Sequence, residues 1–255
     1  MINNIFDSHA HYNDHAFDAD RKEMLRSLPS KGIDLIVNIG ASMDDCQPIL
    51  ALTQEYSYIY GALGVHPDDA EKVPEDYIQT LKEYILSGDK IKAVGEIGLD
   101  YHYEGYSREA QMKVFIQQLE LAKELDLPVV IHSRDACEDT LNILKKYRPR
   151  GVMHCFGYSA EIAEEVVKLG MYIGFTGVLT FINAKNALRA IKKVPLDRLL
   201  LETDCPYMAP EPFRGKRCDS SMIEKTAAKA GEILGKTPEE IADITNRNAR
   251  RFYNI

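Results

Sequence analysis

The chain has 255 residues, of which 45% are hydrophobic and 27% charged, so it can bury a full core and does not have the composition of a disordered chain. Its formal net charge of -8 argues against a protein that coats nucleic acid, because such binding relies on many lysine and arginine contacts to phosphates. The longest apolar runs fall far short of the roughly 18 residues of a membrane-spanning helix, so we expect no membrane association.

Short apolar, β-branched runs alternate with helical patterns along the whole chain, as in βα units with a parallel sheet. Apolar residues within 112–125 recur at three and four residues, which predicts a helix, and Thr237-Pro238 with Glu240 forms a capping box at the start of another. The runs predict eight strands, at residues 4–9, 33–40, 59–66, 91–98, 127–132, 150–155, 171–176 and 197–203.

Eight βα units in about 250 residues, without a linker or an internal repeat, predict one (β/α)₈ TIM barrel formed by residues 1–255 as a single domain. The sites of such barrels lie at the carboxyl ends of the strands. The competing doubly wound sheet would usually carry a glycine-rich phosphate loop after its first strand. "DSHAHYND" occupies that position instead.

Side chains that bind metal ions stand at several of these strand ends. His9 and His11 share one face of the first strand, since alternate side chains of a strand point the same way. Glu96 lies inside an apolar run, where a carboxylate is costly to bury without a cation or hydrogen-bond donors. Three further strands end on His132, His154 and Asp204. We therefore predict a metal centre rather than a set of incidental core histidines.

Six ligands exceed the three protein ligands typical of a single catalytic zinc site, so we expect two divalent ions. One ion is assigned to the first-strand histidines and Asp204, the other to His132 and His154, and Glu96 is expected to span them. Two such ions can clamp a phosphoryl group and lower the pKa of the attacking water. Glu96 and Asp204 are the predicted catalytic residues, with Asp204 orienting that water or accepting its proton. Histidine and carboxylate ligands leave the metal open among zinc, magnesium and manganese.

A set of motifs along the chain resembles the TatD-type metal-dependent deoxyribonucleases. The resemblance runs from residue 7 to the C-terminus and rests on "DSHAH", "GVHP", "GEIGLDY", "VVIHSRDA", "HCFGYS", "GFTGVLTF", "LLLETDCPYMAP" and "RGKR". It implies a metal-dependent hydrolase on a TIM barrel, with the six predicted ligands at the metal-binding motifs of the family. It also implies DNA as substrate and 3′-to-5′ removal of nucleotides from a single strand. After "RGKR" the family commonly continues with Asn-Glu-Pro, whereas this chain has Cys218-Asp219-Ser220, which puts the substrate-contacting edge of this loop in doubt.

The loop that follows the eighth strand gathers basic residues in an otherwise acidic protein. Arg214 and Arg217 are predicted to contact phosphate, because the last loops of a barrel often bind it, although a solvated basic turn is the plainer reading. Tyr207 and Phe213 of the same loop could stack on a base or simply pack the loop.

Two further strand ends supply candidates for substrate binding. His66 ends the third strand and is assigned to substrate or to the support of a ligand, and Arg134 lies two residues beyond His132, within reach of a phosphate oxygen. Asp100 and Tyr101 could support Glu96, although turn chemistry also explains an aspartate there.

The predicted metal site favours a hydrolase, the resemblance implies that it acts on DNA, and two alternatives stay open. One is an amidohydrolase-type enzyme acting on a lactone, an amide or an ester such as aminoacyl-tRNA, since a fold does not fix the substrate. Many such sites bridge their metals with a modified lysine, and no lysine stands at a strand-end ligand position here. The other is a binding protein with a structural metal, although structural zinc sites are usually closed and rich in cysteine.

The sequence also gives an expectation for location and partners. The first residues lack the basic and apolar regions of a secretory signal, and the five cysteines include no C-x-x-C pair, as is usual for reduced thiols. We therefore expect a cytoplasmic protein, and the resemblance implies single-stranded DNA as its substrate. Nothing in the sequence predicts a stable protein partner.

Overall fold

The computed structural model describes residues 2–255 and has the predicted (β/α)₈ TIM-barrel fold. Eight strands form one parallel sheet in chain order from β1 to β8. The residues that follow β8 contact the end of β1, where Cys205 pairs with Ala10 in parallel and the backbone N–H of Asp204 donates to His9 O at 2.8 Å. The strands are β1 Ile5–Ala10, β2 Ile33–Ile39, β3 Ile59–Leu63, β4 Ile91–Asp100, β5 Val129–Arg134, β6 Gly151–Met153, β7 Tyr172–Phe175 and β8 Leu199–Leu201.

Helices occupy the connections between the strands and the C-terminal end of the chain. Thr237 caps the last helix with the predicted capping box, because its side chain accepts from Glu240 N while the Glu240 side chain accepts from Thr237 N. Among residues 2–255, no helix combines the length and apolarity that crossing a bilayer requires. The helices are α1 Arg21–Ser27, α2 Cys46–Glu55, α3 Tyr77–Ser87, α4 Arg108–Glu124, α5 Cys137–Tyr147, α6 Ala160–Lys168, α7 Lys185–Ala190, α8 Ile223–Leu234 and α9 Pro238–Tyr253.

The contacts within the chain divide it into two compact units. The first comprises the residues up to Asn38 with Cys155–Lys168 and Tyr172–Ile255, and the second comprises Ile39–His154 with Leu169–Met171. The predicted single domain stays a prediction.

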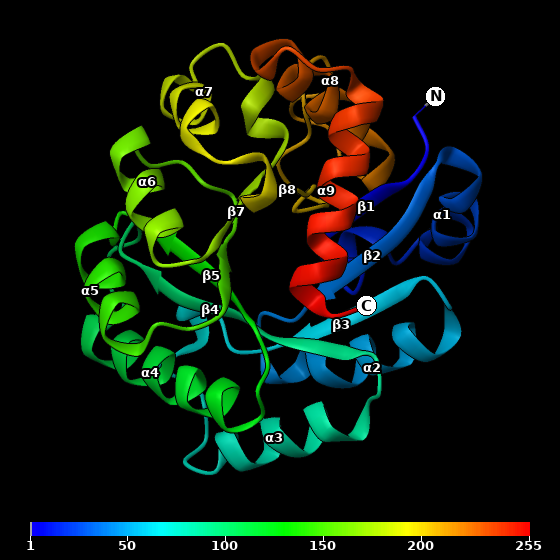
Figure 1. Ribbon diagram of the computed structural model, residues 1–255. Coiled ribbons are helices and arrows are strands. Elements are labelled where there is room, and N and C mark those ends of the chain that lie inside the picture. The colour runs from blue at the N-terminus through cyan, green and yellow to red at the C-terminus, as the bar shows by residue number, and fades with distance from the viewer. Residues whose placement is uncertain (1) are drawn as a thin grey trace. The chain divides into compact units, whose positions relative to one another are not determined.

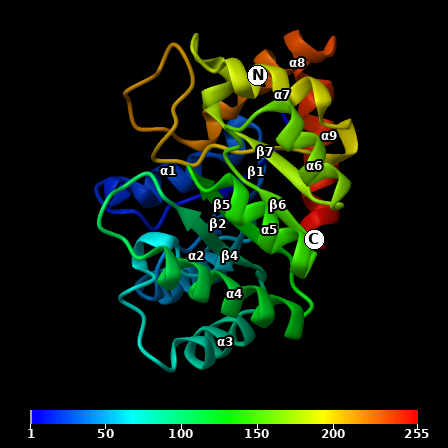
Figure 2. The same cartoon turned by 90° about the vertical axis from the view of Figure 1, so that its left-hand side faces the viewer.

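In the first unit the C-terminal helix covers the first strand. The Tyr253 hydroxyl of α9 donates to Ser8 O of β1 at 2.8 Å, and its ring stacks on Phe6 with centroids 6.1 Å apart. Helices α8 and α9 lie side by side, as both views show (Figures 1 and 2). The end of β1, which carries His9, is thereby held from the outside.

In the second unit strands β3, β4 and β5 lie next to one another, with α3 and α4 on their outer side (Figure 1). Helix α4 buries an apolar stripe that includes Val114, Phe115 and Leu119, as its spacing predicts. It also buries two glutamines that the apolar pattern does not anticipate. Gln111 bonds both the N–H and the C=O of Asp100, at 2.9 and 2.8 Å, and Gln118 does the same for Val65, at 2.8 and 3.0 Å. These amides fix the end of β4 and the residue before His66.

Lys90 binds the turn before β3 in the second unit. The Lys90 ammonium donates hydrogen bonds to backbone carbonyl oxygens at N–O distances of 2.8–3.2 Å. Burial lowers the pKa of Lys90. The carbonyl acceptors belong to Thr53, Tyr56, Ser57 and Ile59.

Replacing Lys90 with methionine is expected to lower the free energy of unfolding by about 1–3 kcal/mol, because the partly buried carbonyls lose their donor. Chemical denaturation of this variant against Lys113→Met, an exposed lysine on α4, measures the difference. Equal midpoints for the two variants would show that water replaces the ammonium without loss.

Candidate metal centre

His9, His11 and Asp204 bring three donor atoms together in the first unit. His9 Nε2 lies 3.0 Å from His11 Nε2, and Asp204 Oδ1 lies 3.6 and 3.3 Å from these two nitrogens. Two ligands 2.0–2.1 Å from a tetrahedral ion lie roughly 3.3 Å apart. The three side chains are buried and their donor atoms have the spacing of ligands to one ion.

Asp7 fixes the two strand ends that carry this first group. Its carboxylate accepts from the backbone N–H of His9 at 3.3 Å and of Thr203 at 3.0 Å, and from the hydroxyls of Thr203 and Ser220, both at 2.6 Å. Burial raises the pKa of Asp7 to about 6, against the lowering effect of the Ser220 and Thr203 hydrogen bonds. Asp7 is therefore ionised at neutral pH, as its four donors require.

Asp204 itself has a backbone that favours glycine. Its φ of 60° is left-handed, which costs an ordinary residue on the order of 1–2 kcal/mol. Such conformations persist where the surroundings determine them, and they gather at functional sites. The bonds from Asp204 N to His9 O and from His11 N to Cys205 O, both 2.8 Å, supply that support.

Glu202 is a buried carboxylate of the first unit that the sequence reasoning missed. Its two oxygens accept from Cys155 N at 2.6 Å and from the Ser8 hydroxyl at 3.3 Å. A Cβ on Gly174 of β7 would lie 2.4 Å from Glu202 Oε2, so a larger residue there would displace this carboxylate. The signal was present, because Glu202 stands in the apolar run "LLLET" as Glu96 stands in "AVGEIG".

A second group of donor atoms in the second unit joins Glu96, His132 and His154. Glu96 Oε1 lies 2.8 Å from His132 Nδ1 and 2.7 Å from His154 Nε2, and these nitrogens are 3.2 Å apart. A Cβ on Gly98, at φ 149°, would lie 1.9 Å from His132 O, so this glycine lets β4 approach β5 where the ligands stand. The strand register therefore places a carboxylate and two imidazoles around one point.

Asp100 holds the ring of His132 in place. Its Oδ2 lies 3.1 Å from His132 Nε2, which leaves His132 Nδ1 facing Glu96. Burial alone would lower the pKa of His132, but its hydrogen bonds with Asp100 and Glu96 raise that pKa to about 9. Two carboxylates thus hold a positive charge at this imidazole, and a metal ion would supply that charge in place of the proton. Asp100, expected to support Glu96, contacts His132.

Replacing Asp100 with asparagine is expected to weaken metal binding by about 10- to 100-fold, because carboxylates behind a ligating histidine orient the ring and raise its basicity. Titration of divalent ions into the metal-free protein measures this, with Asp89→Asn as the control at an exposed aspartate of the same unit. Identical affinities would show that Asp100 does not act through His132.

His66 stands beside the second group without joining its shortest contacts. His66 Nε2 lies 3.8 Å from Glu96 Oε1, and its ring centroid lies 4.4 Å from that of His132. Burial, followed by the nearby His132, lowers the pKa of His66 to about 3, so the ring is neutral at pH 7. Asp68 N–H donates to His66 Nδ1 at 3.2 Å, which assigns the remaining proton to Nε2. A neutral N–H donor therefore faces the group.

The predicted phosphate-binding arginines differ in their surroundings. Arg134 is exposed, with its guanidinium 5.3 Å from the Tyr103 ring centroid, and Arg214 is exposed and lies 4.3 Å from that of Phe181. Both stack on an aromatic ring, which leaves N–H groups at the edge of the guanidinium for an anion.

Arg217 instead ties down the long loop between β8 and α8 (orange in Figure 2). Its Nη1 and Nη2 donate to the two carboxylate oxygens of Asp20 at 2.7 and 2.6 Å, Nη1 also donates to Ala16 O, and the guanidinium lies 4.8 Å from the Phe17 ring centroid. The structure thus gives Arg217 an anchoring role, and its contact with phosphate stays a prediction.

The residues that differ from the family motif after Arg217 pack inside the protein. Cys218 and Ser220 are fully buried. Asp219 accepts from Ser221 N and caps a short 3₁₀ helix, Ser220–Met222. Ser220 also bonds the Tyr12 hydroxyl at 2.8 Å, so these residues support β1 and the loop from within.

The two groups have the chemistry of open metal sites. Each combines two imidazoles with one carboxylate, the nitrogen and oxygen donors of catalytic zinc and related ions. Comparison with known proteins decides the family: the family model described as TatD related DNase matches residues 6–254.

The chain belongs to this TatD family. The uncharacterized metal-dependent hydrolase YabD of Bacillus subtilis is 41% identical over 254 residues, covering 98% of this chain and 99% of that protein. The uncharacterized metal-dependent hydrolase YcfH of Escherichia coli K12 is 33% identical over 257 residues, covering 98% and 96%. The crystal structure of YjjV, a TatD homologue of E. coli K12, superposes with a TM-score of 0.94 at 32% identity over 100% of both chains. The chain is thus a metal-dependent hydrolase of the TatD family.

Proposed function

We propose that this hydrolase cleaves phosphodiesters of DNA and removes nucleotides from the end of a single strand. The observation that carries the proposal is the pair of groups, each with two imidazoles and a carboxylate, in a chain matched by the TatD-related DNase model. The 3′-to-5′ direction follows the family resemblance.

We propose that each group holds one divalent ion, of zinc, magnesium or manganese. The first ion would be held by His9, His11 and Asp204, and the second by Glu96, His132 and His154; the spanning role of Glu96 stays a prediction. Bound ions of this kind stabilise charge on a phosphoryl group and lower the pKa of water. Each ion is assigned to the strand ends of its own unit, where the sites of TIM barrels lie.

The chain's own residues supply orientation and proton transfer in this proposal. Asp204 orients the attacking water and accepts its proton, since its carboxylate is held at a fixed strand end. His66, neutral and with its Nε2–H toward the group, donates to a phosphate oxygen. Arg134 and Arg214 contact the flanking phosphates through the edges of their guanidinium groups, and Arg217 is assigned there as the sequence predicts. The cytoplasmic location is proposed on the sequence pattern.

An end-labelled single strand tests the proposal. Metal-free protein is supplied with zinc, magnesium or manganese, and release of labelled nucleotides is followed with and without EDTA. The expected result is release that needs metal and is faster on single-stranded than on duplex DNA. A parallel panel of lactones, amides and aminoacyl esters covers the amidohydrolase alternative. If carboxylic esters were hydrolysed while the DNA remained uncleaved with each of the three ions, the nuclease proposal would be overturned.

A further inference from the structure

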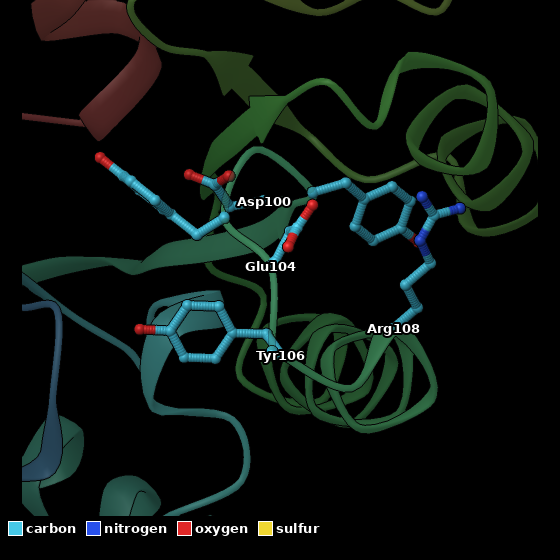
Figure 3. A pocket seen from close by; sticks show the side chains of 7 residues that line it. Asp100, Glu104, Tyr106 and Arg108 are labelled. Atoms are coloured by element: carbon cyan, nitrogen blue, oxygen red, sulfur yellow. The ribbon is translucent and has the colours of Figure 1, made fainter.

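The connection between β4 and α4 forms a pocket of about 240 Å³ that has no part in the proposed catalysis (Figure 3). Glu104 projects into the middle of the pocket in this view, between Asp100 and Tyr106, with Arg108 on the other side (Figure 3). Besides Gly105, the lining residues are three tyrosines, two carboxylates and one arginine, namely Tyr101, Tyr103, Tyr106, Asp100, Glu104 and Arg108.

One wall of the pocket is fixed and the rest presents aromatic surface. The Tyr101 hydroxyl donates to Asp139 at 2.9 Å, and the Arg108 guanidinium lies 4.2 Å from the Tyr101 ring centroid. Tyr103 and Tyr106 are 53% and 38% exposed. The pocket therefore offers accessible tyrosine rings on which a flat ring can stack.

The pocket adjoins the second metal-binding group through the side chain of Asp100. Asp100 lines it, and the same carboxylate holds His132 Nε2 at 3.1 Å. On the opposite edge of its ring, His132 faces Glu96. A group seated in this pocket lies next to a phosphate held at the second group.

The charges of the pocket select a base rather than a phosphate. Asp100 and Glu104 are acidic, and the only lining cation among the residues described, Arg108, lies against Tyr101. An anion would be repelled, whereas a nucleobase is uncharged and stacks on aromatic rings. Arg134, stacked on Tyr103 with Nη1 3.4 Å from the hydroxyl, places a cation at the rim for the adjoining backbone.

We propose that this pocket is a nucleobase subsite, in which Tyr103 and Tyr106 stack on one base of the bound strand and Glu104 accepts a hydrogen bond from its exocyclic amino group. The inference rests on the proposed function and adds a preference to it. Cytosine, adenine and guanine carry such an amino group, whereas thymine presents only carbonyl oxygens at these positions, so the subsite disfavours thymine.

Steady-state kinetics on strands that differ at a single nucleotide near the labelled end test the stacking. The double variant Tyr103→Ala/Tyr106→Ala is expected to raise KM about 10-fold, while the Phe double variant keeps the rings and the wild-type KM. A strand with an abasic sugar at the recognised position should raise KM for the wild type and leave the alanine variant unchanged. Leu86→Ala, which removes a 65% exposed side chain from α3, is the matched control.

Glu104→Ala tests the base preference separately. Wild-type protein should favour cytosine over thymine at the recognised position by about 5- to 10-fold, and the Glu104→Ala variant should lose most of that ratio, with thymine unaffected, because alanine has no oxygen to accept from the amino group. Equal KM values for the wild type and the alanine double variant, or an abasic penalty that persists in that variant, would overturn the subsite while leaving the nuclease intact. A wild-type protein that cleaves neither the intact nor the abasic strand under any ion overturns the proposed function and the subsite with it.

Discussion

Asparagine in place of Asp204 is expected to lower kcat for nucleotide release by about 10²- to 10⁴-fold, because Asp204 is proposed both to hold a metal ion and to accept the proton of the attacking water. Asparagine keeps the size and the left-handed tendency of the position, at φ 60°, but neither accepts a proton nor carries a charge. The fold is expected to survive, since the backbone bonds of Asp204 and His9 are untouched. Single-turnover cleavage and thermal melting of the same preparation measure both quantities.

The matched control for this variant is Asp197→Asn, an exposed aspartate of the first unit that lies 3.4 Å from Arg198. It should cleave at the wild-type rate. If the Asp204→Asn protein kept the wild-type kcat, Asp204 would have no catalytic role. If the variant lost its cooperative melting transition, the metal held there would be structural.

Alanine in place of His132 has the second largest expected effect, with kcat reduced by about 10³-fold, because loss of a metal ion removes several kcal/mol of charge stabilisation. The substitution leaves Glu96 and Asp100 as buried carboxylates without the imidazole between them. We expect less metal bound per chain after desalting, measured by elemental analysis, together with a lower melting temperature.

His102→Ala is the control for this loss, since His102 is an exposed histidine of the same unit whose Nδ1 lies 2.8 Å from Asp135. It should retain the full metal content. If His132→Ala also retained the wild-type metal content and rate, the second group would not be a metal site.

The fold could be predicted from sequence because its signals are local. Each strand is a short apolar, β-branched run, and the Thr237 capping box marks a helix start through residues three positions apart. Strand alternation put His9 and His11 on one face, and the structure brings their Nε2 atoms to 3.0 Å.

The supports of the site could not be predicted because their partners come from distant parts of the chain. The Asp7 carboxylate accepts hydrogen bonds from Thr203 and Ser220, which lie about 200 residues later in the sequence. No local pattern around Asp7 predicts these contacts. Gln111 on α4 fixes Asp100 through an amide that an apolar pattern cannot anticipate. For Arg217 the local pattern gave an incomplete prediction. A basic loop predicts contact with phosphate, whereas the pairing of Arg217 with Asp20 can be seen only in the structure.

Simultaneous measurement of bound metal and nucleotide release tests the central claim most directly. Metal-free protein is titrated with manganese, bound ions are counted per chain, and release from an end-labelled single strand is followed at each point. The account predicts no release without metal and a rise in rate that is complete when two ions are bound. Release from the metal-free protein, or intact DNA at full metal occupancy, would contradict it.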